Sequence, residues 1–226
     1  ADKISLYGVK QKIIQWYWCG VFGEQYGSAN ETRFAMDLPD VVQWVESGPD
    51  PRTVRDASFA PTRLLSLQSR LAAAYKGLTA LLMKNGSKDF ISGTPVDLNT
   101  YFNNAIDIHH VFPRAWCESK MLPREKWNSV VNKAPLAAGT NRFISGDAPS
   151  EYLARIQKNK QVTTANLDDF LMSHVIPVDA LRSDDFDIFI LRRASALLGL
   201  IETATGKVVS GRDSEETLKA FGGTLT

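Results

Sequence analysis

Two adjacent histidines, His109 and His110, and two later asparagines, Asn132 and Asn141, are the residues of this chain best suited to chemistry. A histidine side chain titrates near neutral pH, so one of the pair could take a proton from water. The other imidazole and an asparagine amide oxygen can both bind a divalent cation. A base beside a cation is what hydrolysis of a phosphodiester requires, so residues 106–152 are the candidate site.

The pattern around these residues predicts a strand, a loop, a second strand and a helix. Alternating apolar residues indicate a first strand over residues 106–112, which a proline ends. A second strand is predicted around residues 130–131 and ends at Pro135, and residues 136–144 fit a short helix that carries Asn141. In this arrangement a cation would be held between the first strand and the helix.

Helical periodicity in the rest of the chain predicts a mainly α protein. Apolar residues recur at helical spacing in six segments, residues 3–19, 37–46, 64–83, 149–158, 167–174 and 184–202. We expect a helical domain with an inserted ββα unit. Its parts would be a helical platform over residues 1–104, the ββα unit with its following helix over residues 105–158, and a C-terminal helical part over residues 159–226. Asp40 is the predicted cap of one helix, and Ser183 or Asp184 the predicted cap of another.

The composition is that of an ordinary soluble protein. Hydrophobic residues make up 44% of the chain and charged residues 23%, and no apolar run is long enough to cross a bilayer. We therefore expect a cytoplasmic protein without a membrane partner. Cys19 and Cys117 lack the spacing of a zinc knuckle or a disulfide framework, and we interpret both as ordinary reduced thiols.

Positive charge is concentrated around the candidate site. The net charge of +1 is not that of a general nucleic-acid-binding protein. Residues 110–160, however, contain nine lysines and arginines against four acidic residues. This local excess favours an anionic substrate at the site.

The motifs of this stretch resemble a known nuclease family. Asp-Ile-His-His-Val-Phe-Pro at residues 107–113, the Asn-Ser-Val-Val-Asn-Lys-x-Pro-Leu motif at 128–136 and Thr-Asn-Arg at 140–142 are similar to the HNH motif, the ββα-metal finger. More narrowly, residues 106–152 resemble the C-terminal nuclease region of GmrSD-like, modification-dependent restriction and phage-defence proteins. Weaker similarities to that branch extend over most of the chain, at Trp16 to Trp18, Arg33, Asp37, Ser173, His174, Phe186, Arg192 and Arg193.

The resemblance implies a role for each candidate residue in a metal-dependent DNA endonuclease. His110 matches the general base that activates water. His109 takes a metal-ligand position where many relatives have aspartate, and Asn141 matches the second metal ligand on the helix. Asn132 matches the asparagine that ties the loop between the two strands to the finger. Asp107 shares a strand face with His109 and could orient its ring.

The expected partners are a divalent cation and DNA. Because His109 and Asn141 are both neutral, DNA phosphate and water would have to balance the charge of the cation. Mg²⁺ is the expected physiological ion, with Mn²⁺, Ni²⁺ or Zn²⁺ as alternatives that favour imidazole. Arg142, Arg114 and Lys133 are the expected phosphate contacts, Arg142 because its guanidinium can bind two oxygens at once.

Alternative interpretations remain open at this point. The finger could have lost catalysis and serve as a DNA-binding or regulatory module, whereas a structural zinc finger lacks its four Cys or His ligands. The related restriction proteins imply an upstream sensor or nucleotide-hydrolysing domain outside this chain. We interpret His174 as a packing histidine and Cys117 as a buried thiol, and Arg192 and Arg193 as either facing DNA or solvated.

Overall fold

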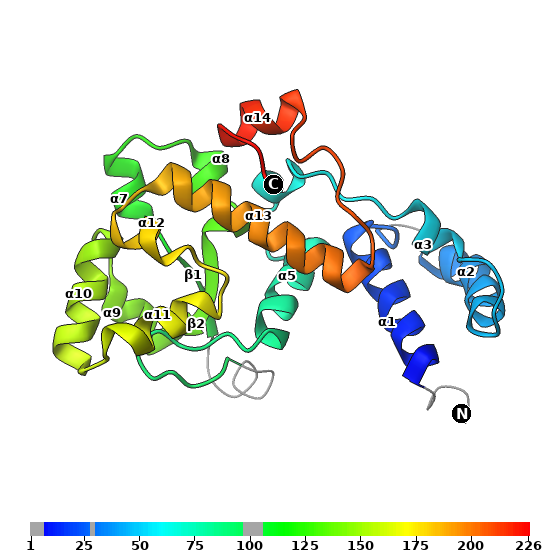
Figure 1. Ribbon diagram of the computed structural model, residues 1–226, viewed down its shortest axis with the longest axis horizontal. Coiled ribbons are helices and arrows are strands. Elements are labelled where there is room, and N and C mark those ends of the chain that lie inside the picture. Colours follow the sequence, from blue (N-terminus) through cyan, green and yellow to red (C-terminus); the bar gives the residue numbers. More distant parts are fainter. Residues whose placement is uncertain (1–6, 28–29, 97–105) are drawn as a thin grey trace.

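The computed structural model describes residues 7–27, 30–96 and 106–226, with the backbone alone at Asn30, Ile106 and Asp107. This part of the chain is mainly helical and contains one two-stranded antiparallel sheet, so the prediction of a mainly α protein is confirmed. The molecule is elongated, with the sheet near one end and the first three helices at the other (Figure 1). None of the described helices is long and apolar enough to span a membrane.

The N-terminal end of the molecule consists of α1 (Tyr7–Phe22), α2 (Asn30–Val45) and α3 (Arg52–Asp56). The prediction for α2 is wrong at its start, because the helix begins before residue 37 and continues through Pro39. Asp40, the predicted cap, therefore lies inside the helix. Asp37, one turn earlier, accepts hydrogen bonds from three other parts of the chain, and these tertiary contacts attach this part of α2 to its neighbours.

A single long helix was expected over residues 64–83, but the structure has two short ones, α4 (Arg63–Ser66) and α5 (Ala73–Lys84). Between them, the carbonyl oxygen of Leu67 accepts a hydrogen bond from Val130 N at 2.8 Å. The carbonyl oxygen of Gln68 accepts one from Lys133 Nζ at 3.1 Å. These two contacts hold the segment between the helices against η2 and the start of β2, where the chain leaves the helical conformation.

The sheet pairs β1 (Ile106–His110) with β2 (Lys133–Ala137), with His109 opposite Ala134 and His110 opposite Lys133. The connection between the strands contains α7 (Arg114–Ser119), α8 (Arg124–Trp127) and the 3₁₀ turn η2 (Val130–Asn132). The second strand was thus predicted too early, since residues 130–131 form the turn. Pro135 lies within β2 opposite Ile108, which a two-stranded sheet tolerates because each strand has an open edge.

Helices complete the C-terminal half: α9 (Ala138–Ile144), α10 (Pro149–Lys160), α11 (Thr164–Met172), α12 (Val178–Arg182), α13 (Phe186–Thr205) and α14 (Glu215–Phe221). The long helix α13 crosses the molecule from the sheet end to α1 (Figure 1). Its N-cap is Asp185, which accepts from Ile188 N at 3.1 Å, and neither of the predicted caps, Ser183 and Asp184. Asp184 instead accepts two hydrogen bonds from Ser150 at the start of α10.

One hydrophobic core extends through all three predicted parts of the chain, from Trp18 in α1 to Leu225 after α14. Phe112, directly after β1, is fully buried and its ring contacts those of Trp116, Phe186 and Phe189. The residues that follow the histidine pair are thus anchored against α7 and α13. This anchoring fixes where β1 ends, and with it the position of both histidines.

Candidate functional site

His109 and His110, at the end of β1, line one open depression with a volume of about 410 Å³. Its other walls come from the start of α7 and the end of α9, and include Arg114, Glu118, Ser145 and Gly146. The α9 helix contacts both strands, so the order strand, strand, helix is also an arrangement in space. The two adjacent histidines therefore border one depression, although His109 is largely buried.

The His110 ring is half-buried and held from one side by α8. Its Nε2 lies 3.1 Å from Asn128 Oδ1, and its ring faces the edge of the Trp127 ring at a centroid distance of 5.7 Å. Burial lowers the pKa of His110, the hydrogen bond with Asn128 opposes this, and the cations of Lys133 and Arg114 lower the pKa further. The lowered pKa favours the neutral imidazole, the form that can accept a proton.

His109 and Asn141 are the two expected metal ligands. His109 is 8% exposed on β1. Asn141 lies on α9, as predicted, one turn before Ser145, whose N–H donates to the Asn141 carbonyl oxygen. An imidazole nitrogen and an amide oxygen on adjoining elements are a donor pair that suits a divalent cation. No group of three or more His, Cys, Asp or Glu that could hold a metal occurs in the described part of the chain, and the side chain of Asp107 lies outside it.

Asn132 is fully buried and ties the two ends of the connection between the strands together. Its Oδ1 accepts from Phe112 N at 2.8 Å, and its Nδ2 donates to Phe112 O and to Trp127 O, each at 2.9 Å. The Asn132 carbonyl oxygen also accepts from Val111 N at 2.8 Å. These bonds fix the backbone immediately after His110.

The three expected phosphate contacts differ in their surroundings. Arg142 is exposed on α9. Arg114 is also exposed, lines the depression and pairs with Glu118 at 2.7 Å. Lys133 does not fit the expectation, because it is 9% exposed and its Nζ donates to Gln68 O and lies 5.6 Å from the centre of the Tyr75 ring. Burial lowers the pKa of Lys133 to about 8, with Arg70 adding to the effect.

Arg193 is a supporting residue that sequence reasoning placed wrongly, since neither a DNA-facing nor a solvated position is observed. It is 0% exposed, and its guanidinium donates to Val131 O at 2.7 Å and to Lys133 O at 2.9 Å. Arg193 thereby fixes the start of β2 from α13. Its spacing from the buried Ile190 and Leu197, three and four residues away, could have identified it as a core position. Arg192 is exposed and pairs with an aspartate of α12.

Asp89 is a second supporting residue that was missed. Its carboxylate is buried and accepts from Ala137 N at 3.1 Å and from Thr140 Oγ1 at 2.8 Å, at the first turn of α9. It also accepts from Ile91 N and Ser92 N, each at 3.0 Å. One side chain therefore joins the turn after α5 to the helix that carries Asn141. The Asp-x-x-Ser pattern of this turn was the available signal.

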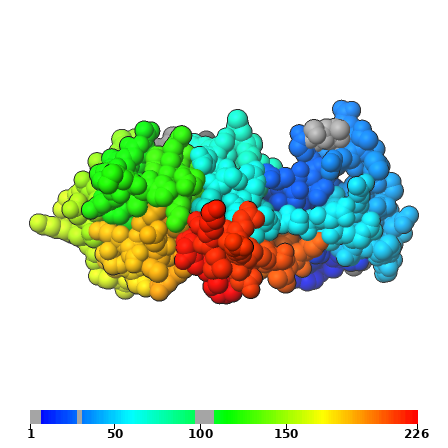
Figure 2. All heavy atoms as spheres, turned by 90° about the horizontal axis from the view of Figure 1, so that it is seen from above, coloured from blue at the N-terminus to red at the C-terminus, as the bar shows by residue number. Residues whose placement is uncertain are grey.

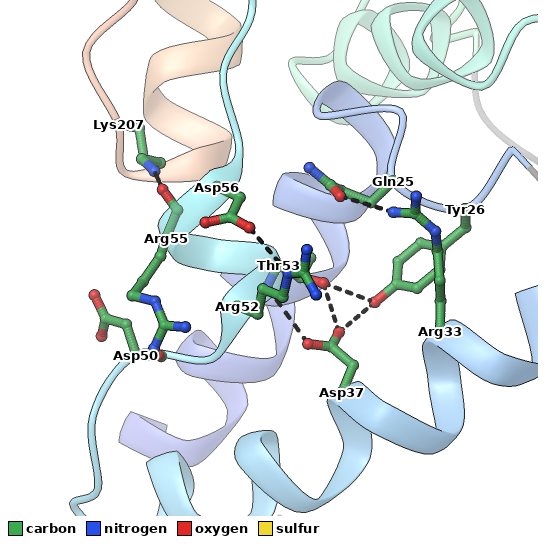
Figure 3. Close-up of polar contacts among 10 residues, drawn as sticks. All are labelled: Gln25, Tyr26, Arg33, Asp37, Asp50, Arg52, Thr53, Arg55, Asp56 and Lys207. Atoms are coloured by element: carbon green, nitrogen blue, oxygen red, sulfur yellow. Dashed lines mark hydrogen bonds and ion pairs between the residues drawn. The ribbon is translucent and has the colours of Figure 1, made fainter.

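Asp37, which the resemblance singled out, lies far from the histidines at the other end of the molecule. It accepts a hydrogen bond from Trp16 Nε1 at 2.5 Å. It also accepts from Thr53 Oγ1 at 2.6 Å and from Tyr26, as Figure 3 shows. Burial would raise the pKa of this carboxyl, but the hydrogen bonds from Thr53, Tyr26 and Trp16 outweigh it, so the pKa is lowered. The hydrogen bonds of Asp37 thus join α1, α2 and α3, which is a structural role.

His174 and Cys117 are both buried, as expected for packing residues. His174 Nε2 donates to Lys88 O at 2.8 Å, and its ring packs edge-on against Phe90. Burial lowers the pKa of His174 to about 3 and raises the pKa of the Cys117 thiol to about 12. Neither group is thus suited to acid–base or nucleophilic chemistry near neutral pH.

Comparison with known proteins gives one match. No family model matches the chain, and no solved structure matches it. A protein of Methanocaldococcus jannaschii, named Uncharacterized protein MJ0686, is 32% identical over 157 residues. The match covers 66% of this chain and 26% of that protein, so the chain spans about a quarter of the length of the relative it matches. This relative carries no named activity, so the match by itself indicates no function.

Proposed function

We propose that this chain is a metal-dependent DNA endonuclease domain of the HNH type, in which β1, β2 and α9 are the ββα-metal finger. The observation that carries the proposal is the shared depression at His109 and His110, which opens between the finger's first strand and the end of its helix. The hydrogen bonds of Asn132 across the loop support the same assignment.

In the proposed reaction His110 takes a proton from a water molecule, whose oxygen forms a bond to phosphorus. The phosphorus bond to the leaving oxygen breaks, and that oxygen is protonated from solvent. A divalent cation, with Mg²⁺ as the expected physiological ion, would stabilise negative charge on the phosphate oxygens. His109 on β1 and Asn141 on α9 would hold it. Asn141 is not among the residues that line the depression, whereas Glu118, which pairs with Arg114, is one of them.

The DNA would be held mainly through its phosphates. Arg114 and Arg142 are exposed guanidiniums, and such groups position a backbone without reading bases. We further propose that the domain is the effector of a restriction or phage-defence protein and that a sensor or nucleotide-hydrolysing unit outside this chain directs it. The much greater length of the matched relative is consistent with such a unit.

Nicking of supercoiled plasmid tests the proposal. The wild-type protein, His110→Ala and the exposed-residue control Asn166→Ala are purified identically and assayed with Mg²⁺, Mn²⁺ or Ni²⁺. We expect nicking that requires the cation, equal rates for wild type and the control, and a loss of about a hundredfold or more for His110→Ala. A folded wild-type protein that nicks with none of these ions overturns the proposal and leaves a DNA-binding module. Equal nicking by His110→Ala overturns the role of His110.

The two ligand positions are tested by the dependence of nicking on cation concentration. We expect His109→Ala and Asn141→Ala to raise the concentration needed for half-maximal rate, with saturating cation restoring part of the activity. His110→Ala should lose rate at every concentration. A half-maximal concentration unchanged in both ligand variants would contradict the assignment of the pair.

A further inference from the structure

We propose that Asn128 and Gln68 are positioning residues that keep the proton of the neutral His110 ring on Nε2, so that Nδ1 is the nitrogen that accepts a proton from water. This inference rests on the proposed hydrolysis at His110 for its catalytic meaning. Its structural content, the choice of tautomer, can be measured without any activity.

Three side chains and one backbone carbonyl form a continuous chain of contacts. His110 Nε2 lies 3.1 Å from Asn128 Oδ1. Asn128 Nδ2 donates to Gln68 Oε1 at 3.3 Å, and Gln68 Nε2 donates to the carbonyl oxygen of Leu65 at 3.4 Å. This series of contacts, the relay, starts at His110 on β1 and passes through Asn128, directly after α8. It ends at Leu65 in the helical N-terminal half of the protein.

The donor and acceptor of every hydrogen bond in the relay follow from the Leu65 carbonyl oxygen at its end. The backbone oxygen of Leu65 can only accept, so the end of Gln68 that faces it must be the NH₂ group. Gln68 Oε1 then faces Asn128, so Asn128 must donate to it through its own NH₂ group. This leaves Asn128 Oδ1 facing the histidine, and an oxygen acceptor requires a protonated Nε2. The other ring nitrogen, Nδ1, keeps its lone pair.

Gln68, at the other end of the relay from His110, lies in the segment that interrupts the predicted long helix. Leu67 O accepts from Val130 N and Gln68 O accepts from Lys133 Nζ, so two backbone carbonyls hold this segment against η2 and β2. Figure 2 shows the green segment between the strands lying directly against the cyan segment of α4 and α5. The helical half thus supplies a residue to the candidate site, although its sequence shows no catalytic pattern.

Two contacts restrict the orientation of the His110 ring. The edge-on contact with Trp127 restricts the ring on one side, and the Asn128 contact fixes Nε2. Because His110 also lines the depression and its Nε2 is engaged by Asn128, we assign Nδ1 as the nitrogen that would accept a proton from water there. Holding a base in the productive tautomer is the role that an orienting hydrogen-bond acceptor has in other histidine-dependent sites.

Nitrogen-15 NMR of the imidazole in the metal-free protein measures the tautomer directly. The spectrum is recorded above the pH range in which histidines titrate, and the His110 signals are assigned by their absence in His110→Ala. We expect a protonated Nε2 and a lone-pair Nδ1 in the wild type and in Asn128→Asp, whose carboxylate still accepts. Asn128→Leu and Gln68→Leu should shift the population toward the Nδ1-protonated form, whereas Asn166→Leu, an exposed control, should not.

Steady-state kinetics on plasmid or duplex DNA provide the second measurement. We expect Asn128→Leu and Gln68→Leu to lower kcat about 10- to 100-fold with little change in KM, and Asn128→Asp to retain most of kcat. Circular dichroism and thermal melting show whether each variant folds. Gln68 and Asn128 are half-buried, so one of the two leucine variants can fail to fold and the other still decides.

The outcomes separate this inference from the proposed function. A wild-type protein that never nicks, yet has Nε2 protonated in an Asn128-dependent way, supports the relay and rejects the endonuclease. A protein that nicks but carries its proton on Nδ1 rejects the relay alone. Unchanged tautomer and kcat in both leucine variants would likewise overturn it.

Discussion

The side-chain amide of Asn132 bonds to the backbone of Phe112 in both directions, with Oδ1 accepting from its N–H at 2.8 Å and Nδ2 donating to its carbonyl at 2.9 Å. One buried side chain thereby reproduces the paired bonds by which a strand neighbour would hold this residue. The position matters because Phe112 is two residues from His110. The same hydrogen bonds of Asn132 therefore close the loop and fix the backbone next to the proposed base.

Asn132→Ala should destabilise the protein strongly. The change leaves Phe112 N, Phe112 O and Trp127 O without this partner in the interior, and each such group costs about 1–3 kcal/mol, so we expect a loss of about 3 kcal/mol or more. Urea denaturation measures it, with Asn166→Ala as the control because that asparagine is exposed on α11. Equal stability of the two variants would contradict the structural role of Asn132.

Arg193→Met should be far more damaging than Arg192→Met, although the two arginines are neighbours. Arg193 is fully buried and its guanidinium holds the carbonyls of Val131 and Lys133, whereas Arg192 is exposed and pairs with Asp179. Methionine restores some packing but no donors, so we expect a loss of about 2 kcal/mol or more at residue 193 and less than about 1 kcal/mol at residue 192. Similar unfolding midpoints for both variants would show that the carbonyl contacts contribute little.

The elements with a strong local pattern could be predicted from the sequence, and those held by distant contacts could not. The helix that carries Asn141 and the stop after α5, where Gly86 adopts φ +85°, follow from local signals. The interruption after α4 does not follow from local signals, because there the backbone of Leu67 bonds to Val130, which is distant in the sequence. The apolar stripe of residues 64–83 is continuous, so periodicity alone predicts one helix.

The candidate site shows the same division. The histidine pair and both asparagines carry their own pattern and were predicted, and the structure places His109 and His110 in one depression. Asn128, Gln68 and Asp89 were missed, because amides and carboxylates in loops are common and their partners lie in other segments. Lys133 was included for its charge, and only the fold shows that its ammonium turns inward to Gln68.

Stability should fall as the pH is lowered through the ordinary histidine range, because His174 is buried in its neutral form. Its folded pKa of about 3 lies below the ordinary value of 6.5, so between these values the unfolded state binds the proton and the folded state does not. This contribution is fully present above pH 6.5. Below that it decreases by up to about 1.4 kcal/mol per pH unit.

Denaturation of wild type and His174→Gln at several pH values tests this linkage. Glutamine can still donate to Lys88 O but does not titrate, so the variant should be less stable at neutral pH and should show a shallower decline. The comparison is sharpest between pH 5 and pH 6.5, above the ordinary range of carboxyl groups. Parallel stability curves for the two proteins would exclude His174 as the source of the pH dependence.

Arg142→Gln and Lys133→Met should separate a surface phosphate contact from a buried cation. Arg142 is exposed on α9, so its removal should weaken binding to duplex DNA and make the slope of log affinity against log salt shallower by about 0.9. Lys133 is 9% exposed and bound to Gln68 O, so its replacement by the apolar methionine should leave the slope unchanged. Fluorescence anisotropy with a labelled duplex, recorded without divalent cations to prevent cleavage, gives both slopes. A shallower slope for Lys133→Met alone would mean that the lysine leaves its buried position to contact DNA.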